Sequence, residues 1–196
     1  NNADPSRFVV ATDPGGNPVY KDVTNRVIEH VQERALDAII CIGGDGTMSG
    51  AAKLIERGVP CIGVPKTIDN DLMHTEVTFG FHTAVATATE ALDRIHTTAS
   101  SHHRVMLVEM MGRNAGWLTM YAGAASGAAV ILIPEIPFDL DVVCESCLYR
   151  SRHGKAFTIV AVSEGARPKG GKVVVDRVVK DSPDPIRLGG VSQVLS

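Results

Sequence analysis

Residues 36–47 read LDAIICIGGDGT, an apolar run that passes directly into a turn of three glycines around an aspartate. A continuous apolar run of this length is typical of a strand buried on both faces of a parallel sheet. A helical pattern follows over residues 49–57, and Gly58 and Pro60 end it. This stretch therefore predicts a strand, a tight turn and a helix, which together begin a βαβ unit.

The same alternation continues along the chain. Apolar runs predict further strands at residues 59–64, 105–110, 129–133 and 157–162. Helical patterns predict helices at residues 81–98, 114–125 and 139–152. Asp139 or Asp141 supplies an N-terminal carboxylate to the last of these helices, and a short β-rich piece, KVVVDRVV, follows at residues 172–179. Strands that alternate with helices predict an α/β fold with mostly parallel sheets flanked by helices.

Four polar motifs each follow a predicted strand. They are GGDGT (residues 43–47), PKTIDND (65–71), EMMGR (109–113) and SEGA (163–166). In parallel sheets, ligands bind beyond the carboxyl ends of the strands. We therefore expect these four loops to supply the residues of a binding site.

The GGDGT loop has the chemistry of a phosphate site. Glycines let a backbone approach a phosphate closely, and the start of the following helix adds positive potential. Asp45 among these glycines fits a magnesium ligand, because Mg²⁺ takes oxygen ligands and keeps several waters. The alternative is a plain strand-to-helix turn in which Asp45 caps the helix.

The later loops carry charged side chains that suit acid–base chemistry. Asp69 and Asp71 lie close in sequence, so one carboxylate can bind a metal while the other accepts a proton. An Asx-rich turn is the alternative for this loop. Arg113 is placed to clamp a phosphate, or is a surface arginine at a helix start. Glu164 is a candidate acceptor for sugar hydroxyls, or a solvated carboxylate.

The composition argues against several classes of partner. The 196 residues carry a net charge of −3 and 5% aromatic residues, which argues against a nucleic-acid or anionic membrane surface. No apolar run approaches the roughly 18 residues of a membrane span, and the first residues lack a signal-peptide pattern. Cys144 and Cys147 form a C-x-x-C pair without a second ligand pair, so the thiols fit a reduced state. We therefore expect a cytoplasmic protein.

In sequence order, the segments GGDGT, PKTIDND, SSHHR, MMGRNAGW, LIPEIPF and IVAVSEGA resemble the motifs of the 6-phosphofructokinases, over residues 23–166. PKTIDND together with MGR is highly specific to that family. The resemblance implies magnesium-dependent transfer of the ATP γ-phosphoryl group to the C1 hydroxyl of fructose 6-phosphate, a step of glycolysis, by a homo-oligomer (dimer or tetramer). It also implies two half-domains around an active-site cleft, with residues 1–80 in the donor domain and 81–196 in the sugar-phosphate domain.

The resemblance implies a role for each matching residue. Asp69 would be the base that takes the C1 hydroxyl proton, and Asp45 and Asp71 would bind or orient Mg²⁺. Arg113 would stabilise charge on the transferring phosphoryl group, and Arg104 would reach the 6-phosphate of a substrate held by a neighbouring subunit. The residues implied to line the sugar site are Thr67, which contacts the reacting end, Met111, Gly112 and Glu164. The residues implied to hold the donor are Gly43, Gly44, Asp45, Gly46, Thr47 and Lys66.

The donor motif combines two patterns. Pyrophosphate-using members of the family usually have Asp in place of Gly46 and Lys at the position of Lys66, whereas ATP-using members usually have Gly at both. A carboxylate at position 46 would repel the α-phosphate of a nucleotide, so Gly46 favours ATP. The alternatives are a pyrophosphate-dependent enzyme, another GGDGT kinase that acts on lipid or NAD, and a non-catalytic nucleotide-binding regulatory subunit.

Two segments typical of the family, GGDxPGxN and GHxQRGG, do not occur in these 196 residues. The first forms part of the phosphate cradle, and the second supplies basic residues to phosphates. We therefore expect this stretch of chain to be inactive by itself.

Overall fold

The computed structural model describes residues 5–179 and 185–196, and these form two compact units. The first unit holds the chain up to Thr67, the segment Asp71–Phe79 and the residues 178–179 and 185–186. The second unit holds Ile68–Asn70, Gly80–Arg177 and Arg187–Ser196. Both units combine helices with parallel strands, so the predicted α/β class is confirmed.

The first unit is built on a parallel pair of strands. Its elements in chain order are η1 (Pro5–Arg7), β1 (Phe8–Thr12), β2 (Pro18–Lys21), α1 (Thr24–Glu33), β3 (Ile39–Gly43), α2 (Asp45–Glu56), β4 (Cys61–Thr67) and β5 (Phe79–Gly80). The sheet has the order β3-β4-β5, and β3 and β4 are parallel, with Ile39 opposite Cys61 and Gly43 opposite Pro65. The predicted strand–turn–helix–strand sequence is therefore present.

Helices α1 and α2 cover one face of this sheet. Val31 and Leu54 from the two helices pack with Val59, Ile39 and Cys61 in a small core. On the opposite face the side chains of Ile40 and Ile62 are 64% and 60% exposed. The prediction of a strand buried on both faces is therefore wrong for β3, because the described residues leave that second face to solvent.

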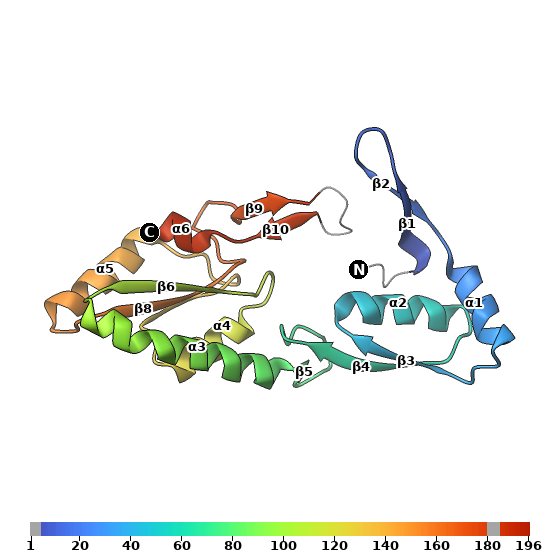
Figure 1. Cartoon of the computed structure of the whole chain (residues 1–196), viewed down its shortest axis with the longest axis horizontal. Coiled ribbons are helices and arrows are strands. Elements are labelled where there is room, and N and C mark those ends of the chain that lie inside the picture. The colour runs from blue at the N-terminus through green and yellow to red at the C-terminus, as the bar shows by residue number, and fades with distance from the viewer. Residues whose placement is uncertain (1–4, 180–184) are drawn as a thin grey trace. The chain divides into compact units, whose positions relative to one another are not determined.

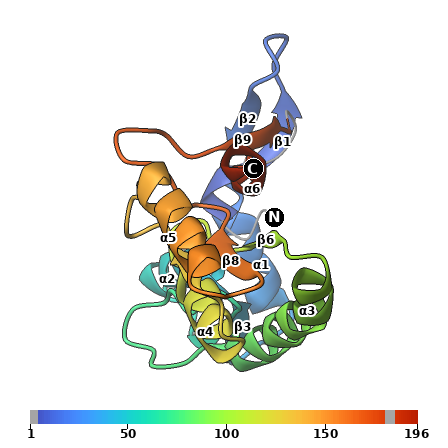
Figure 2. The same cartoon turned by 90° about the vertical axis from the view of Figure 1, so that its left-hand side faces the viewer.

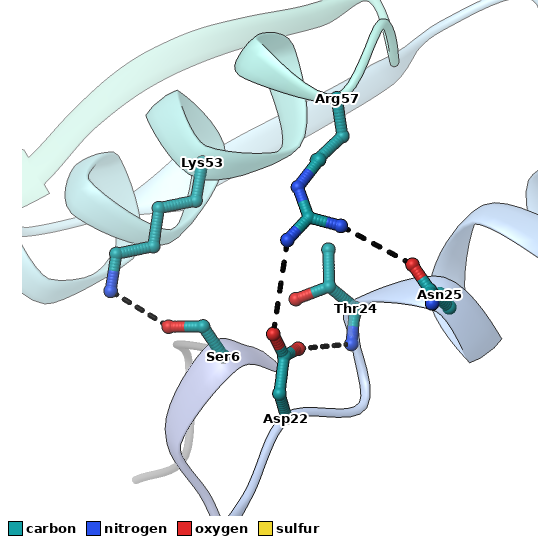
Figure 3. A network of polar contacts seen from close by, with 6 residues as sticks. All are labelled: Ser6, Asp22, Thr24, Asn25, Lys53 and Arg57. Atoms are coloured by element: carbon teal, nitrogen blue, oxygen red, sulfur yellow. Dashed lines mark hydrogen bonds and ion pairs between the residues drawn. The ribbon is translucent and has the colours of Figure 1, made fainter.

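The β1–β2 hairpin and α1 are not among the elements that the sequence analysis predicts. The hairpin strands are antiparallel, and their connecting loop points away from α1, α2 and β3 (Figures 1 and 2). Lys53 in the last turn of α2 and Arg57, which directly follows α2, contact residues at the base of the hairpin. Lys53 Nζ donates to Ser6 Oγ at 2.8 Å, and Arg57 contacts Asn25 Oδ1 at 3.3 Å and Asp22 Oδ2 at 3.9 Å (Figure 3). Polar contacts thus link the end of α2 to the segments that flank the hairpin and to α1.

The second unit contains a three-stranded parallel sheet. Its elements are α3 (Phe81–Ser101), β6 (Val105–Met110), α4 (Trp117–Ala125), β7 (Val130–Leu132), α5 (Leu140–Arg152), β8 (Thr158–Ser163), β9 (Val175–Val178), β10 (Ile186–Leu188) and α6 (Val191–Leu195). The strand order is β6-β8-β7, and Val105 pairs with Thr158 at one end while Met110 pairs with Ser163 at the other. Strands β9 and β10 form a separate pair, and their end residues Val178 and Ile186 are grouped with the first unit. The predicted strands and helices of this unit are all found near their predicted positions.

The second unit is built of three layers, a sheet between two layers of helices. Helices α3 and α4 pack on one face of the sheet, where Leu92, Ala122 and Ile159 form a core. Helices α5 and α6 cover the other face through a core that includes Val143 and Val191 (Figure 1). The central strand β8 is buried at every position, as expected for a strand sandwiched between helical layers. No helix among the described residues is long and apolar enough to cross a membrane.

Two helix starts differ in how well the sequence predicted them. Asp139 caps α5, because its Oδ1 accepts the backbone N–H of Asp141 at 3.1 Å, which confirms the expected carboxylate. Helix α2 begins at Asp45 rather than at residue 49. The N–H groups of Thr47 and Met48 both donate to the Gly44 carbonyl at 3.0 Å, so the glycine motif itself forms the first helical turn.

The layered core predicts a contrast between two leucines of the second unit. Leu92→Ala should lower the free energy of unfolding by about 2–5 kcal/mol, because Leu92 is 0% exposed and its removal leaves a cavity. Leu148→Ala, at a side chain 53% exposed, should change it by less than about 0.5 kcal/mol. Urea unfolding followed by the fluorescence of the single tryptophan, Trp117 in α4, measures both. Equal losses for the two variants would contradict the layer assignment.

Candidate functional site

In the first unit, the GGDGT motif meets residues 65–67, the start of the PKTIDND motif, at the carboxyl ends of β3 and β4. Gly43 lies opposite Pro65 in the parallel ladder. A Cβ atom at Gly44 would lie 3.4 Å from the Thr67 Cβ, so the two loops are in contact. The Thr67 carbonyl accepts the hydroxyl of Thr78 at 2.8 Å, which holds the end of β4. The structure thus brings the predicted donor residues 43–47 together with residues 66 and 67.

The glycines of this loop have distinct roles. A Cβ at Gly43 would collide with the Thr47 side chain, so a glycine is required where Thr47 folds back over the strand end. A Cβ at Gly46 would meet no atom within 4 Å. Gly46 is exposed in the first turn of α2, where N–H groups and the helix dipole favour an anion. The predicted phosphate cradle therefore has an open approach at Gly46.

Asp45 and Asp71, the predicted magnesium ligands, both belong to the first unit and both are exposed. Within residues 5–179 and 185–196 there is no group of three or more His, Cys, Asp or Glu side chains arranged to hold a metal. Mg²⁺ is commonly bound by one or two carboxylates together with waters and substrate phosphates. Two exposed carboxylates fit that mode of binding.

Asp69 belongs to a short segment that is part of the second unit. The next residue, Asn70, has a φ of 52°, a left-handed conformation that asparagine tolerates better than most residues. The negative charge of Asp69 raises the pKa of Glu164, so the two carboxylates interact electrostatically. The structure therefore groups Asp69 with the loops that follow β6 and β8.

The loops that follow β6 and β8 are interlocked by three hydrogen bonds. The backbone N–H of Glu164 donates to the Met110 carbonyl at 2.9 Å. The Gly112 carbonyl accepts two donors, the Gly165 N–H at 3.1 Å and the Ser163 hydroxyl at 2.8 Å. Two motifs that lie far apart in sequence, MGR and SEGA, thus form one structure.

Two glycines allow this close approach. Gly112 has a φ of 144°, and a Cβ there would lie 2.8 Å from the Ala115 carbonyl oxygen and would also collide with the Ser163 hydroxyl. A Cβ at Gly165 would collide with the Arg113 carbonyl oxygen. Any larger side chain at either position would separate the loops.

Glu164 lies in a mixed electrostatic environment. Burial raises the pKa of its carboxyl most strongly, whereas the backbone N–H of Gly112 and the Arg113 guanidinium lower it. The negative charges of Asp69 and Glu109 raise it again, and the net shift of the Glu164 pKa is upward. A half-buried carboxylate beside an arginine is suited to accept hydrogen bonds from a bound ligand.

Glu109 is a structural residue that the sequence analysis did not select. Its carboxylate accepts the N–H of Gly190 at 2.9 Å, the N–H of Ser192 at 3.0 Å and the Ser192 hydroxyl at 2.8 Å. These bonds hold the start of α6 against β6. The sequence does contain a sign of this role, because Glu109 is an acidic residue within the apolar run VMLVEM. A carboxylate that is half-buried in such a strand needs hydrogen-bond donors.

Arg104 does not lie at the same end of the sheet as the other predicted site residues of its unit. It directly precedes β6, whereas Met111, Gly112 and Arg113 follow the opposite end of that strand. Six residues of strand span about 20 Å. One copy of the chain therefore cannot bring Arg104 and Arg113 to the same phosphate, and the predicted role of Arg104 in a neighbouring subunit stays a prediction.

The parallel sheets and the loops at their carboxyl ends define an α/β protein of the class that binds ligands beyond its strand ends. The chain matches the family model described as phosphofructokinase over residues 11–189. It therefore belongs to the phosphofructokinase family, as its motifs predict.

Three relatives illustrate the likeness. The ATP-dependent 6-phosphofructokinase 2 of Clostridium perfringens is 55% identical over 184 residues, which are 94% of this chain and 50% of that protein. The pyrophosphate–fructose 6-phosphate 1-phosphotransferase of Streptomyces coelicolor is 50% identical over 182 residues, 92% of this chain and 53% of that protein. The crystal structure of a pyrophosphate-dependent phosphofructokinase from Nitrosospira multiformis has a TM-score of 0.71 at 25% identity, over 87% of this chain and 51% of that one. The chain spans about half the length of these curated relatives.

The interlocked loops predict that Gly165 cannot be replaced. Gly165→Ala should lower the free energy of unfolding by about 1–3 kcal/mol, because the new methyl group must displace the Arg113 carbonyl. Gly46→Ala is the control, since its methyl group meets open space and alanine favours a helix by at most about 1 kcal/mol. Urea unfolding followed by circular dichroism compares the two variants. The interlock is refuted if Gly165→Ala is as stable as the parent.

Proposed function

We propose that the complete protein is a magnesium-dependent 6-phosphofructokinase that transfers the γ-phosphoryl group of ATP to the C1 hydroxyl of fructose 6-phosphate. The observation that carries this proposal is the interlock of the MGR and SEGA loops. It joins the Gly112 carbonyl to Ser163 and Gly165, which flank Glu164, and Arg113 and Asp69 both act on the Glu164 charge. A base, an arginine and a hydroxyl acceptor in one neighbourhood suit the acceptor side of a phosphoryl transfer.

On the acceptor side, Asp69 takes the proton of the C1 hydroxyl. Thr67 contacts the reacting end of the sugar, and Met111 and Gly112 line the sugar site. Glu164 accepts hydrogen bonds from sugar hydroxyls when it is ionised. Arg113 neutralises charge that develops on the transferring phosphoryl group, which is the main way that proteins accelerate this reaction.

On the donor side, the loop of Gly43, Gly44 and Gly46 receives the phosphates at the start of α2, and Lys66 adds positive charge. Thr47 belongs to the same loop. Asp45 and Asp71 would hold Mg²⁺, which supplies charge neutralisation for the phosphates when it is bound.

The C1 oxygen of the sugar bonds to the γ-phosphorus of ATP, and the bond from that phosphorus to the β–γ bridging oxygen breaks. The hydroxyl proton passes to the Asp69 carboxylate, and ADP leaves with the bridging oxygen. Positioning and charge neutralisation supply most of the acceleration in such a transfer.

The same reasoning assigns the two parts of the chain. Residues 1–80 contribute to the donor domain, and residues 81–196 contribute to the sugar-phosphate domain. The resemblance to the family assigns Arg104 to the 6-phosphate bound by a neighbouring copy, which makes the protein a homo-oligomer. The positions of Arg104 and Arg113 at opposite ends of β6 are compatible with that role.

A pyrophosphate-dependent phosphofructokinase is the second candidate. Lys66 and the names of the Streptomyces and Nitrosospira relatives favour it. The open space at Gly46 favours ATP, because it leaves room for the α-phosphate of a nucleotide. A comparison of ATP and pyrophosphate as donors, in turnover assays of the complete protein, separates the two and also tests the proposal against a non-catalytic subunit.

Replacing the proposed base should abolish most turnover. In the complete protein, Asp69→Ser should lower kcat by at least about 10²-fold, the usual scale for the loss of a general base, with a much smaller effect on the Kd of fructose 6-phosphate. Asp93→Ser, at an exposed acid on α3, is the control and should leave both constants unchanged. A kcat within about threefold of the parent for Asp69→Ser would remove Asp69 from the role of base.

A carboxylate at position 46 should select against the nucleotide. Gly46→Asp should lower kcat/KM for ATP by at least about 10²-fold, because like charges a few ångströms apart repel by several kcal/mol when partly desolvated. The space around Gly46 accommodates the side chain, so folding should be retained. Steady-state kinetics with varied ATP measure the effect, and unchanged constants would eliminate the electrostatic account of donor choice.

A further inference from the structure

Ser163 is a fully buried residue that the proposed chemistry does not use. It is the last residue of β8 and directly precedes Glu164. Its hydroxyl donates to the Gly112 carbonyl at 2.8 Å, and the Gly165 N–H donates to the same oxygen at 3.1 Å. The two residues on either side of Glu164 thus hold one carbonyl of the neighbouring loop.

The Gly112 peptide needs such external restraint. Glycine adopts many backbone conformations at similar cost, so its own preference does not fix the orientation of the loop. The φ of 144° at Gly112 lies in a region that only glycine adopts readily. The bonds from β8 therefore select this conformation, and of the two donors only the Ser163 hydroxyl comes from a side chain.

We propose that Ser163 is a positioning residue, whose hydroxyl holds the Gly112 carbonyl so that Met111, Gly112 and Arg113 face the sugar phosphate in a fixed relation to Glu164. This inference rests on the proposed function, because it concerns the sugar-phosphate side of that site. In this role Ser163 acts on the substrate only indirectly, through the loop that contains Gly112.

The electrostatics of Glu164 supply a signature for this role. The Gly112 N–H and Arg113 lower the pKa of Glu164, and both belong to the loop that Ser163 holds. Burial raises that pKa, and so do the charges of Asp69 and Glu109, two residues that lie outside the loop held by Ser163. If the loop is loosened, we expect the contributions of Gly112 and Arg113 that lower the pKa to weaken, while the charges of Asp69 and Glu109 that raise it remain.

The sign of the pH effect follows from this balance. Glu164 accepts sugar hydroxyls when it is ionised, so sugar binding weakens as the pH falls through its pKa. If the Ser163 hydroxyl is removed, the pKa of Glu164 rises further. The acid limb of the pH profile then moves to higher pH.

The test compares two buried serines in the complete protein. Ser163→Ala should raise KM for fructose 6-phosphate by about tenfold near neutral pH, the scale of one lost hydrogen bond, and should move the acid limb of kcat/KM to higher pH. Ser126→Ala is the matched control, because Ser126 is also buried and its hydroxyl donates to the Gly123 carbonyl at 3.3 Å, at the end of α4. It should change neither the KM nor the acid limb.

A second measurement keeps the inference separate from the proposed function. NMR titration of the Glu164 side-chain carboxyl carbon should give a higher pKa in Ser163→Ala than in the parent, whether or not the protein turns over. Ser163→Cys, which has a similar volume and a weaker donor, should shift the pKa in the same direction and replaces the alanine variant if that variant does not fold.

The outcomes of these measurements test the role of Ser163 and the proposed function separately. An unchanged Glu164 pKa in Ser163→Ala, or equal effects of Ser163→Ala and Ser126→Ala, overturns the positioning role. A parent protein with no fructose 6-phosphate kinase activity, with either ATP or pyrophosphate, overturns the proposed function, and the Glu164 titration then still decides whether Ser163 holds the loop.

Discussion

Parallel pairing of β6 with β8 is the constraint on which the second unit depends. Because the two strands run in the same direction, their carboxyl ends meet at one edge of the sheet, and Met110 lies beside Ser163. Loops that are 51 residues apart in sequence then share hydrogen bonds at the Gly112 carbonyl. The helices on both faces bury β8 completely, so the strand cannot shift its register without exposing a row of apolar side chains.

In the first unit the same principle operates with fewer layers. β3 and β4 bring Gly43 beside Pro65, and α2 begins immediately beyond the strand end. The glycines matter here because Thr47 folds back over Gly43, where any side chain would collide with it. Both units therefore present their polar loops in the same way, at the carboxyl ends of parallel strands.

Sequence patterns predicted best the features that depend on local chemistry. β6 was predicted with its observed bounds, because a six-residue apolar run stands between polar segments, and the capping role of Asp139 follows from its place before α5. The exposed face around Ile40 could not be predicted, since exposure depends on which elements cover a strand. The β1–β2 hairpin was missed although its loop contains Pro14, Gly15, Gly16 and Asn17, which are typical turn residues. The link from Ser163 to Gly112 needs the tertiary structure, because nothing local connects them.

The contacts of Glu109 with α6 have a consequence for the order in which the chain folds. They join residues separated by 81 and 83 positions, so forming them closes a long loop at an entropic cost. Helix α6 begins at Val191, directly after Gly190, whose N–H Glu109 accepts. Its first turn takes its hydrogen-bond acceptor from β6, a strand that must already be in place. We therefore expect α6 to dock late on the folding pathway, after the central sheet of the second unit has assembled.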